Sequence, residues 1–147
     1  MHSSLINEFD RVLTGGTYIR GNECNLFEKT FAKYCGSTEC VGVGNGYDAL
    51  CACLWSIGLE PGDEVIVPGL TVVMDAYAAL HLNATPVFAD VDEDTFLITA
   101  DTIKSKITRR TKAIIVVSLQ GLPVDIDPIM KLARKKNLFV IEDNAQD

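Results

Sequence analysis

The chain has 147 residues, the length of one ordinary domain, and its composition, 48% hydrophobic and 22% charged, is that of a folded globular protein. Its net charge of -7 argues against a nucleic-acid partner, because phosphate binding needs clustered basic residues. Apolar runs fall far short of the ~20 residues of a membrane span and no signal pattern opens the chain, so we expect a cytoplasmic protein. Five cysteines without C-x-x-C spacing indicate free thiols rather than a disulfide framework or a zinc site.

Five short apolar runs rich in β-forming residues predict strands. They cover residues 40–43, 64–67, 86–91, 113–117 and 138–142. Their near-continuous apolar character is typical of a parallel sheet that is covered on both faces.

Apolar residues at helical spacing predict helices between these strands. Two stripes repeat at positions i, i+4 and i+7: Phe27, Phe31 and Tyr34, and then Leu50, Leu54 and Ile57. We expect each stripe to be buried. Gly36 and Gly58 follow the two stripes, where a left-handed C-cap favours glycine. Further along, Thr99 or Asp101 is expected to cap one helix and Asp125 another.

The alternation of strand and helix predicts an α/β domain with a largely parallel sheet. In such sheets ligands bind at the carboxyl ends of the strands, so the residues that follow each strand are the candidates for chemistry. These are residues 44–46, 68–71, 92, 118–121 and 143. No linker or internal repeat divides the sequence, which we therefore treat as one structural unit.

The first candidate is the turn formed by Gly44, Asn45 and Gly46, which leads from a predicted strand into a helix. Glycines let the backbone approach an anion closely, and free N–H groups of a first helical turn can hold a phosphate. Neither a G-x-G-x-x-G pattern nor a Walker lysine is present, so a connection that binds nothing is the alternative.

A second candidate is Asp143, which ends the last predicted strand and leaves a carboxylate at the mouth of an apolar sheet. It could serve a cofactor, cap a following helix or bind a metal. Asp92 and Asp94 stand in an acidic run typical of a solvated turn. His2 and His81 have no nearby residues in ligand spacing, which favours surface or core packing.

A series of motifs in register runs through nearly the whole chain. They are TYIRG at 17–21, FE at 27–28, VGVGNGYDAL at 41–50, GLEPGDEVIVP at 58–68, TPVF at 85–88, TRRTKAI at 108–114 and IEDNAQ at 141–146. With these motifs the chain resembles the DegT/DnrJ/StrS sugar aminotransferases. The resemblance implies the large domain of a fold-type-I transferase dependent on pyridoxal 5'-phosphate (PLP), a three-layer α/β/α domain. Residues 1–147 would be the N-terminal part of that domain, with its C-terminal part and a small domain beyond.

In this family an amino group moves from an amino acid, commonly glutamate, to a nucleotide-linked keto sugar, in the service of polysaccharide biosynthesis. By position, Asn45, Gly46 and Tyr47 would hold the PLP phosphate. Asp143 would pair with the protonated pyridine nitrogen, which keeps the ring an effective electron sink. Gln146 would approach the phenolic oxygen of the ring. The resemblance also implies a homodimer and no metal.

The chain departs from the family pattern at several positions. Val72 stands where an aromatic residue usually stacks on the cofactor, which would reduce stacking to apolar contact. Tyr47 replaces a common threonine, and Ser118 replaces a common histidine. The lysine that forms the Schiff base would lie beyond Asp147. The lysines of this chain fall on charged helix faces or in a polar turn, so we expect none of them to replace it.

Three functions remain open at this point. The chain could be the N-terminal fragment of a sugar aminotransferase, inactive by itself. It could belong to a PLP-dependent nucleotide-sugar dehydratase of the same family, in which a histidine replaces the lysine. It could also be a non-catalytic or split-enzyme subunit that binds a complementary chain.

Overall fold

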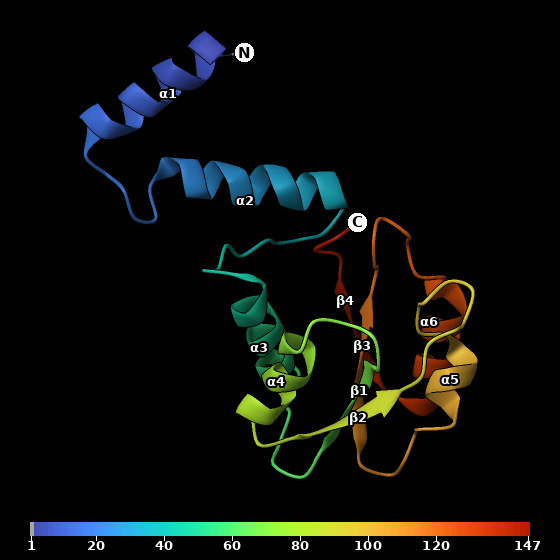
Figure 1. Ribbon diagram of the computed structural model, residues 1–147. Helices are drawn as coiled ribbons and strands as arrows, with labels where there is room; N and C mark the ends of the chain where they lie inside the picture. The colour runs from blue at the N-terminus through green and yellow to red at the C-terminus, as the bar shows by residue number, and fades with distance from the viewer. Residues whose placement is uncertain (1) are drawn as a thin grey trace. The chain divides into compact units, whose positions relative to one another are not determined.

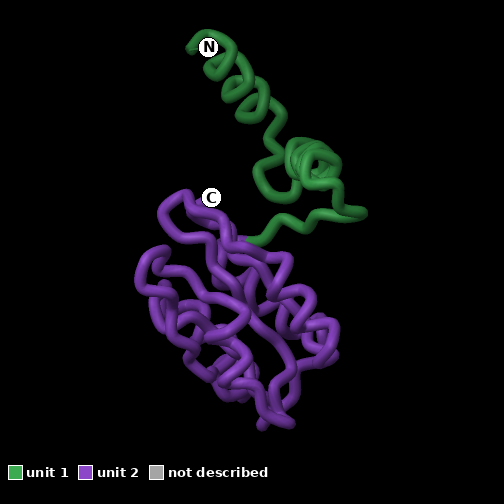
Figure 2. The backbone as a smooth tube through the Cα atoms, turned by 90° about the vertical axis from the view of Figure 1, so that its right-hand side faces the viewer, with its two compact units in different colours: residues 1–43 green, residues 44–147 purple. Residues whose placement is uncertain are grey.

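The computed structural model describes residues 2–147, and the chain divides into two compact units. The first unit ends at Val43, and the second comprises residues 44–147 (Figure 2). The sequence contains no linker that marks this division. Among the described residues, no helix is both long enough and apolar enough to cross a membrane.

Two helices, α1 (His2–Gly15) and α2 (Asn22–Cys35), form the regular structure of the first unit. Helix α2 is the helix that the aromatic stripe predicts, and it ends at Gly36 with a φ of 67°, the left-handed C-cap that favours glycine. The stripe was expected to be buried, and this prediction is wrong: Phe27, Phe31 and Tyr34 are all exposed, Tyr34 by 86%. Helix α2 instead buries Ala32, and the three rings contact one another along its surface.

The strand predicted at residues 40–43 is not formed. A strand needs a neighbour to complete its ladder of hydrogen bonds, and these residues pair with no strand in the described part of the chain. The N–H group of Gly42 donates instead to Oε1 of Glu28 in α2, at 2.7 Å. The sheet therefore has four strands.

These four strands all lie in the second unit. They are β1 (Glu64–Pro68), β2 (Thr85–Ala89), β3 (Thr111–Val117) and β4 (Phe139–Asp143). Their order across the sheet is β2-β1-β3-β4, and every neighbouring pair is parallel. The predicted parallel sheet is thus confirmed, with strand ends close to those expected from the sequence.

Helices cover both faces of this sheet, as Figure 1 shows. On one side lie α3 (Gly46–Ser56) and α4 (Met74–His81), and on the other lie α5 (Ala100–Lys104) and α6 (Ile126–Lys136). The second unit is therefore a three-layer α/β/α structure, as the sequence predicts.

Three of the expected helix boundaries can be compared with the structure. Gly58 follows α3 with a φ of 69°, as expected for a left-handed cap. The Thr99 side chain caps α5 by accepting a hydrogen bond from the N–H of Thr102, which identifies Thr99 rather than Asp101 as the cap. Asp125 occupies the N-cap position of α6 but its side chain makes no capping hydrogen bond.

Alternating strand residues build a separate core on each face. Toward α3 and α4 point side chains such as Val65, Val67 and Ile115, which pack with Leu50 and Leu54 of α3. Toward α5 and α6 point Ile66, Ile114 and Val116, which pack with Ile103 and Ile129. Each fully buried aliphatic side chain contributes about 1.5–3 kcal/mol, so the two clusters fix the helices on the sheet.

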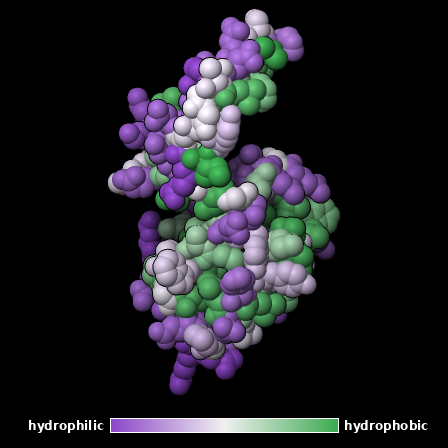
Figure 3. Space-filling view, turned by 90° about the vertical axis from the view of Figure 1, so that its left-hand side faces the viewer, coloured by the Kyte–Doolittle hydropathy of each residue, from purple (hydrophilic) through white to green (hydrophobic). Residues whose placement is uncertain are grey.

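The outer surface of the α3 and α4 layer keeps several apolar side chains in solvent. Figure 3 views the molecule from this side and shows apolar atoms gathered on the second unit. Trp55 of α3 is 75% exposed, and Tyr77 and Leu80 of α4 are each about half exposed.

At the amino edge of the sheet, Glu64 is the first residue of β1 and is only 3% exposed. The guanidinium of Arg110 donates to its Oε1 from Nη2 at 2.6 Å and from Nε at 3.0 Å. The hydroxyl of Thr108 donates to Oε2. These hydrogen bonds lower the pKa of Glu64, and the one from Thr108 has the larger effect, followed by those from Arg110. The buried charge is therefore paired and hydrogen-bonded, which joins the start of β1 to the start of β3.

Strand β2 is an edge strand, because it has a neighbour only on its β1 side. Its Pro86 stands opposite Val65 of β1. The N–H of Thr85 donates toward β1, to the carbonyl of Asp63 at 2.8 Å. Since backbone groups alternate in direction along a strand, the ring nitrogen of Pro86 faces the free edge and the ladder to β1 loses no hydrogen bond.

Candidate functional site

A cavity of about 320 Å³ lies where the carboxyl ends of three strands meet. Its walls come from the segment after β1, the end of β3 and the segment at and after β4. The lining residues are Leu70, Thr71, Val72, Val117, Leu119, Asp143, Ala145 and Gln146. Three of the six site residues predicted from the sequence, Val72, Asp143 and Gln146, are thus brought together in one place. We call this cavity the strand-end cavity.

Asp143 is the last residue of β4 and is half-buried at this cavity. Its Oδ1 accepts a hydrogen bond from the N–H of Ala145 at 3.0 Å, which fixes the carboxylate at the strand end. Its backbone carbonyl accepts from the N–H of Ser118 at 3.2 Å. Among the described residues, Asp143 belongs to no cluster that could hold a metal ion.

Gln146 is fixed across the cavity mouth by a residue from the loop after β3. The N–H of Gln120 donates to Oε1 of Gln146 at 2.9 Å, and Gln120 has a positive φ of 56°. A positive φ is uncommon for a residue other than glycine, so the loop is held in an unusual conformation where it meets Gln146.

The other three predicted site residues lie at the start of α3. Asn45 is the N-cap, and its Oδ1 accepts from the N–H of Asp48 at 2.9 Å. The first N–H groups of a helix have no intrahelical acceptor, so those of Gly46 and Tyr47 remain for an anion, at the positive end of the helix dipole. A Cβ at Gly46 would meet nothing within 4 Å, whereas one at Gly44 would lie 2.9 Å from Oδ2 of Asp48. The space over the helix start is therefore open.

The side chain of Tyr47 is directed to α4 rather than to the helix start. Its hydroxyl lies 3.0 Å from Nδ1 of His81, and the two rings meet edge to face with centroids 6.0 Å apart. Partial burial and the neighbouring Cys51 raise the pKa of Tyr47. The packing role expected for His81 is consistent with this contact, but the partner, 34 residues earlier in the chain, had no signal in the sequence.

A further carboxyl group, which the sequence analysis missed, lies behind the strand-end cavity. Asp75 is the second residue of α4 and has no exposed surface. Its Oδ2 is hydrogen-bonded to the hydroxyl of Thr71, which lines the cavity. The pKa of Asp75 is raised to about 6, mainly by burial and also by the negative charge of Asp143. The hydrogen bond from the Thr71 hydroxyl acts in the opposite direction. An acidic residue in a first helical turn is common, and this is why its burial could not be predicted.

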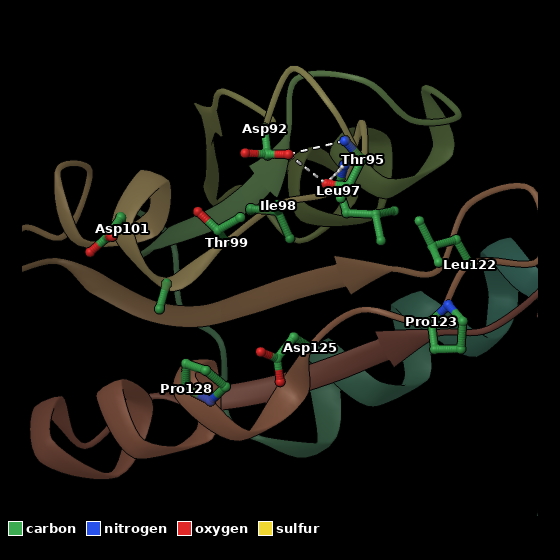
Figure 4. A pocket seen from close by; sticks show the side chains of 11 residues that line it. Asp92, Thr95, Leu97, Ile98, Thr99, Asp101, Leu122, Pro123, Asp125 and Pro128 are labelled. Carbon is green, nitrogen blue, oxygen red and sulfur yellow. Dashed lines mark hydrogen bonds between the residues drawn. The ribbon is translucent and has the colours of Figure 1, made fainter.

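A larger cavity, of about 510 Å³, lies beside the starts of α5 and α6, on the side of the sheet that these two helices cover (Figure 4). Asp92 contributes to its wall. Its Oδ1 accepts hydrogen bonds from the N–H and the hydroxyl of Thr95, both at 3.0 Å, as the dashed lines in Figure 4 show. The backbone N–H of Thr95 is the main cause of the lowered pKa of Asp92. Asp92 therefore stabilises a turn, as the sequence predicts, and its Oδ1 is already hydrogen-bonded to Thr95 within that turn.

Ser118 and the lysines do not contribute to the strand-end cavity. Ser118 is buried, and its hydroxyl oxygen accepts from the N–H of Val124 at 3.4 Å. The side chains of the lysines are exposed, apart from a half-buried Lys112, and none of them lines the cavity. The lysines were expected on charged helix faces or in a polar turn, and Lys112 departs from this expectation because it lies in β3.

The fold defines the class of protein, which is that of the PLP-dependent aminotransferases. An aminotransferase structure from Psychrobacter cryohalolentis superposes with a TM-score of 0.89 at 44% identity, over 93% of this chain and 35% of that chain. An Escherichia coli GDP-4-keto-6-deoxy-D-mannose-3-dehydratase with bound hydrated PLP superposes with a TM-score of 0.85 at 30% identity, over 92% of this chain and 36% of the other.

The chain belongs to the DegT/DnrJ/EryC1/StrS aminotransferase family, whose model matches residues 1–147. A dTDP-3-amino-3,6-dideoxy-alpha-D-galactopyranose transaminase from Aneurinibacillus thermoaerophilus is 47% identical over 137 residues. That match covers 93% of this chain and 38% of the relative. The chain thus spans well under half the length of the proteins that it resembles.

Proposed function

We propose that this chain is the N-terminal part of the large domain of a PLP-dependent enzyme that transfers an amino group from an amino acid to a nucleotide-linked keto sugar. The observation that carries the proposal is the strand-end cavity, which is lined by Asp143 and Gln146 together with apolar side chains. The aminotransferase family supports the type of reaction, and the nucleotide-sugar name of the Aneurinibacillus relative supports the class of substrate.

The residues present fit PLP in three respects. The open helix start at Gly46 matches a phosphate, since a backbone anion site needs room and free N–H groups. Apolar side chains such as Val72, Val117 and Leu119 match the faces of an aromatic ring. A carboxylate at the end of the same cavity matches a ring nitrogen that must stay protonated.

When bound, PLP supplies an electron sink for the transfer of the amino group. Asp143 holds the proton at the ring nitrogen, and its hydrogen bond from Ala145 keeps the carboxylate in place. Gln146, fixed by Gln120, would approach the phenolic oxygen of the ring. The N–H groups of Gly46 and Tyr47 would hold the phosphate, and Val72 would offer the ring an apolar contact.

The lysine that holds the cofactor is proposed to lie beyond Asp147, in the remainder of the protein. A catalytic lysine must be desolvated to lower its pKa toward neutrality, and the side chains of the lysines in this chain are solvent-exposed or half-buried. The expected homodimer remains a prediction from the family resemblance.

A dehydratase is the second candidate, favoured by the superposition on the E. coli dehydratase. The two candidates share the cofactor site and differ at the position of the lysine. A subunit that binds a complementary chain is a third possibility, for which the exposed apolar surface of α3 and α4 is compatible evidence.

The decisive experiment begins with the coding sequence downstream of Asp147. The complete protein is purified, incubated with PLP, reduced with borohydride and mapped by peptide mass spectrometry. One labelled lysine beyond Asp147, with amino transfer from glutamate to a nucleotide keto sugar, supports the proposal. A histidine in its place, with loss of a sugar hydroxyl, favours the dehydratase. Labelling of a lysine within residues 1–147 contradicts our assignment.

A further inference from the structure

The second residue of α4, Asp75, has a carboxyl group whose surroundings are unusual for a charged side chain. The residue has no exposed surface, and one oxygen, Oδ2, is hydrogen-bonded to the Thr71 hydroxyl. The other oxygen, Oδ1, is buried and has no hydrogen-bond partner among the described residues. No basic group in the described part of the chain acts on it. Burial of an unpartnered polar atom is costly, so this atom requires an explanation.

The neighbouring polar group is another acid. Asp143 lines the strand-end cavity together with Thr71, the hydrogen-bond partner of Asp75, and its negative charge helps to raise the pKa of Asp75. Two adjacent carboxylates repel each other, and the usual outcome is that the pair shares one proton. A proton on Oδ1 of Asp75 would convert the unpartnered acceptor into a donor directed at a carboxylate.

The two acids differ in their ability to carry the remaining charge. Asp143 is half-buried and accepts a hydrogen bond from the N–H of Ala145, which stabilises its ionised form. Asp75 is completely buried and has one hydroxyl as its only partner in the described structure. Below about pH 6, the charge therefore stays on Asp143 and the proton on Asp75.

We propose that Asp75 is a positioning residue that keeps the shared proton and donates it in a hydrogen bond to Asp143, orienting that carboxylate toward the cofactor ring nitrogen. The proposal rests on the proposed function, since it assigns the partner of Asp143 in a PLP site. Asp75 does not line the strand-end cavity, so it would act through Asp143 and not on the cofactor itself.

Other nearby groups do not change this assignment. The first turn of a helix favours a negative charge on Asp75, but burial outweighs this effect, as the raised pKa of about 6 indicates. On the packed elements, Tyr47 and Cys51 of α3 interact with each other, and His81 at the end of α4 pairs with Tyr47. Asp143 is the one charged group that acts on Asp75 in the described part of the chain.

The first test measures protonation without the cofactor. The complete protein is labelled with ¹³C in the aspartate carboxyl groups, and the resonance lost in Asp75→Asn is followed from pH 3 to pH 8. We expect this carboxyl group to stay protonated until about pH 6. Ionisation of Asp75 together with the exposed aspartates would overturn the proposal, whatever the activity of the enzyme.

The second test measures PLP affinity by fluorescence quenching in three variants of the complete protein, below pH 6, where Asp75 holds its proton. Asp75→Ala removes the donor and should weaken binding roughly tenfold or more, the value of a hydrogen bond to a charged group. Asp75→Asn keeps an N–H donor and should bind within about threefold of the wild type. Asp101→Asn is the matched control and should bind as the wild type does.

The outcomes separate the two proposals. Equal affinity of Asp75→Ala and the wild type overturns the role of Asp75 while PLP binding itself stands. A wild-type protein that binds no PLP contradicts the proposed function, while the carboxyl titration still decides which acid holds the proton. If Asp75→Ala does not fold, the titration and the affinity of Asp75→Asn decide, because loss of binding in Asp75→Asn would also overturn the proposal.

Discussion

One buried acid, Glu64, lies at the amino ends of the strands, and another, Asp75, lies near their carboxyl ends. The two acids differ in almost every other respect. At the amino edge Glu64 is paired with Arg110 and accepts from Thr108, so both oxygens are satisfied and its pKa is lowered. Near the carboxyl ends of the strands, Asp75 has no cationic partner within residues 2–147, one of its oxygens has no hydrogen bond there, and a second acid acts on it. Its pKa is raised to about 6.

The difference shows where the fold is stabilised and where it is adapted for chemistry. A fully paired buried charge holds two strands together and has no capacity left for a ligand. An incompletely paired cluster is costly in the folded state, and such clusters concentrate at functional sites. We therefore expect substitutions at the amino ends of the strands to alter stability, and substitutions at their carboxyl ends to alter cofactor binding and turnover.

The largest effect is expected for Asp143→Ala in the complete enzyme. Loss of the carboxylate removes the partner of the protonated ring nitrogen, and turnover should fall on the order of 10²–10³-fold, as for other preorganised electrostatic groups. Steady-state kcat/KM with the amino donor and the keto sugar measures it. Glu142→Ala, an exposed neighbour on β4, is the matched control and should retain activity. Near-normal turnover of Asp143→Ala would contradict the assigned role.

The pH dependence of stability should separate the two acids. The folded pKa of Asp75, about 6, lies above its ordinary value of 3.8, so the folded state binds the extra proton and its stability falls as pH rises from about 4 to 6. The loss is on the order of 2–3 kcal/mol, at 1.4 kcal/mol per pKa unit. Glu64, with a lowered pKa, has the opposite sign and loses stability as pH falls through that pKa.

Urea unfolding of the wild type and of Asp75→Asn at a series of pH values measures this contribution. The difference between the two curves should change between pH 4 and 6 and be constant above that range. Parallel curves over the whole range would show that Asp75 ionises normally in the folded protein.

A smaller effect on stability is expected for Arg110→Ala. The change leaves Glu64 buried without its charged donor and should lower the free energy of unfolding by about 1–3 kcal/mol, with PLP affinity unchanged. Arg109→Ala removes a neighbouring exposed arginine and should change stability by less than about 0.5 kcal/mol. An equal effect of the two substitutions would mean that the pair at Glu64 contributes nothing specific.

The smallest effect concerns Val72, at the strand-end cavity. Val72→Phe restores an aromatic ring where the cofactor is expected, and stacking of this kind contributes about 0.5–1.5 kcal/mol. PLP affinity should rise about three- to tenfold. Val73→Phe, at a neighbouring exposed position outside the cavity, is the control. A gain in both variants, or in neither, would contradict the position assigned to the ring.

Most of the second unit could be predicted from the sequence because its signals are local. The four apolar strands and the helix that buries Leu50 and Leu54 follow from patterns within a few residues, whereas the cap of α5 was narrowed only to Thr99 or Asp101. The strand at 40–43 was wrongly predicted, because an apolar run does not reveal whether a neighbouring strand is available. The motifs also located Val72, Asp143 and Gln146, which the structure gathers at one cavity.

What could not be predicted depends on contacts between distant segments. Asp75 is separated from Asp143 by 68 positions, and neither its burial nor its unpartnered oxygen has a signature in the sequence around it. The contact of Tyr47 with His81 is of the same kind. The exposure of Phe31 and Tyr34 on α2 was missed because helical spacing shows which residues share a face, and not whether another element covers that face.

Pro86 has a consequence for association between molecules. Along the free edge of β2, the outward-facing backbone groups belong to Pro86 and Phe88, and proline has no N–H to offer. A strand from a second molecule that approached this edge would therefore find one donor where two are needed for a regular ladder. Pro86 thus disfavours edge-to-edge aggregation through β2 while leaving the parallel pairing inside the sheet intact.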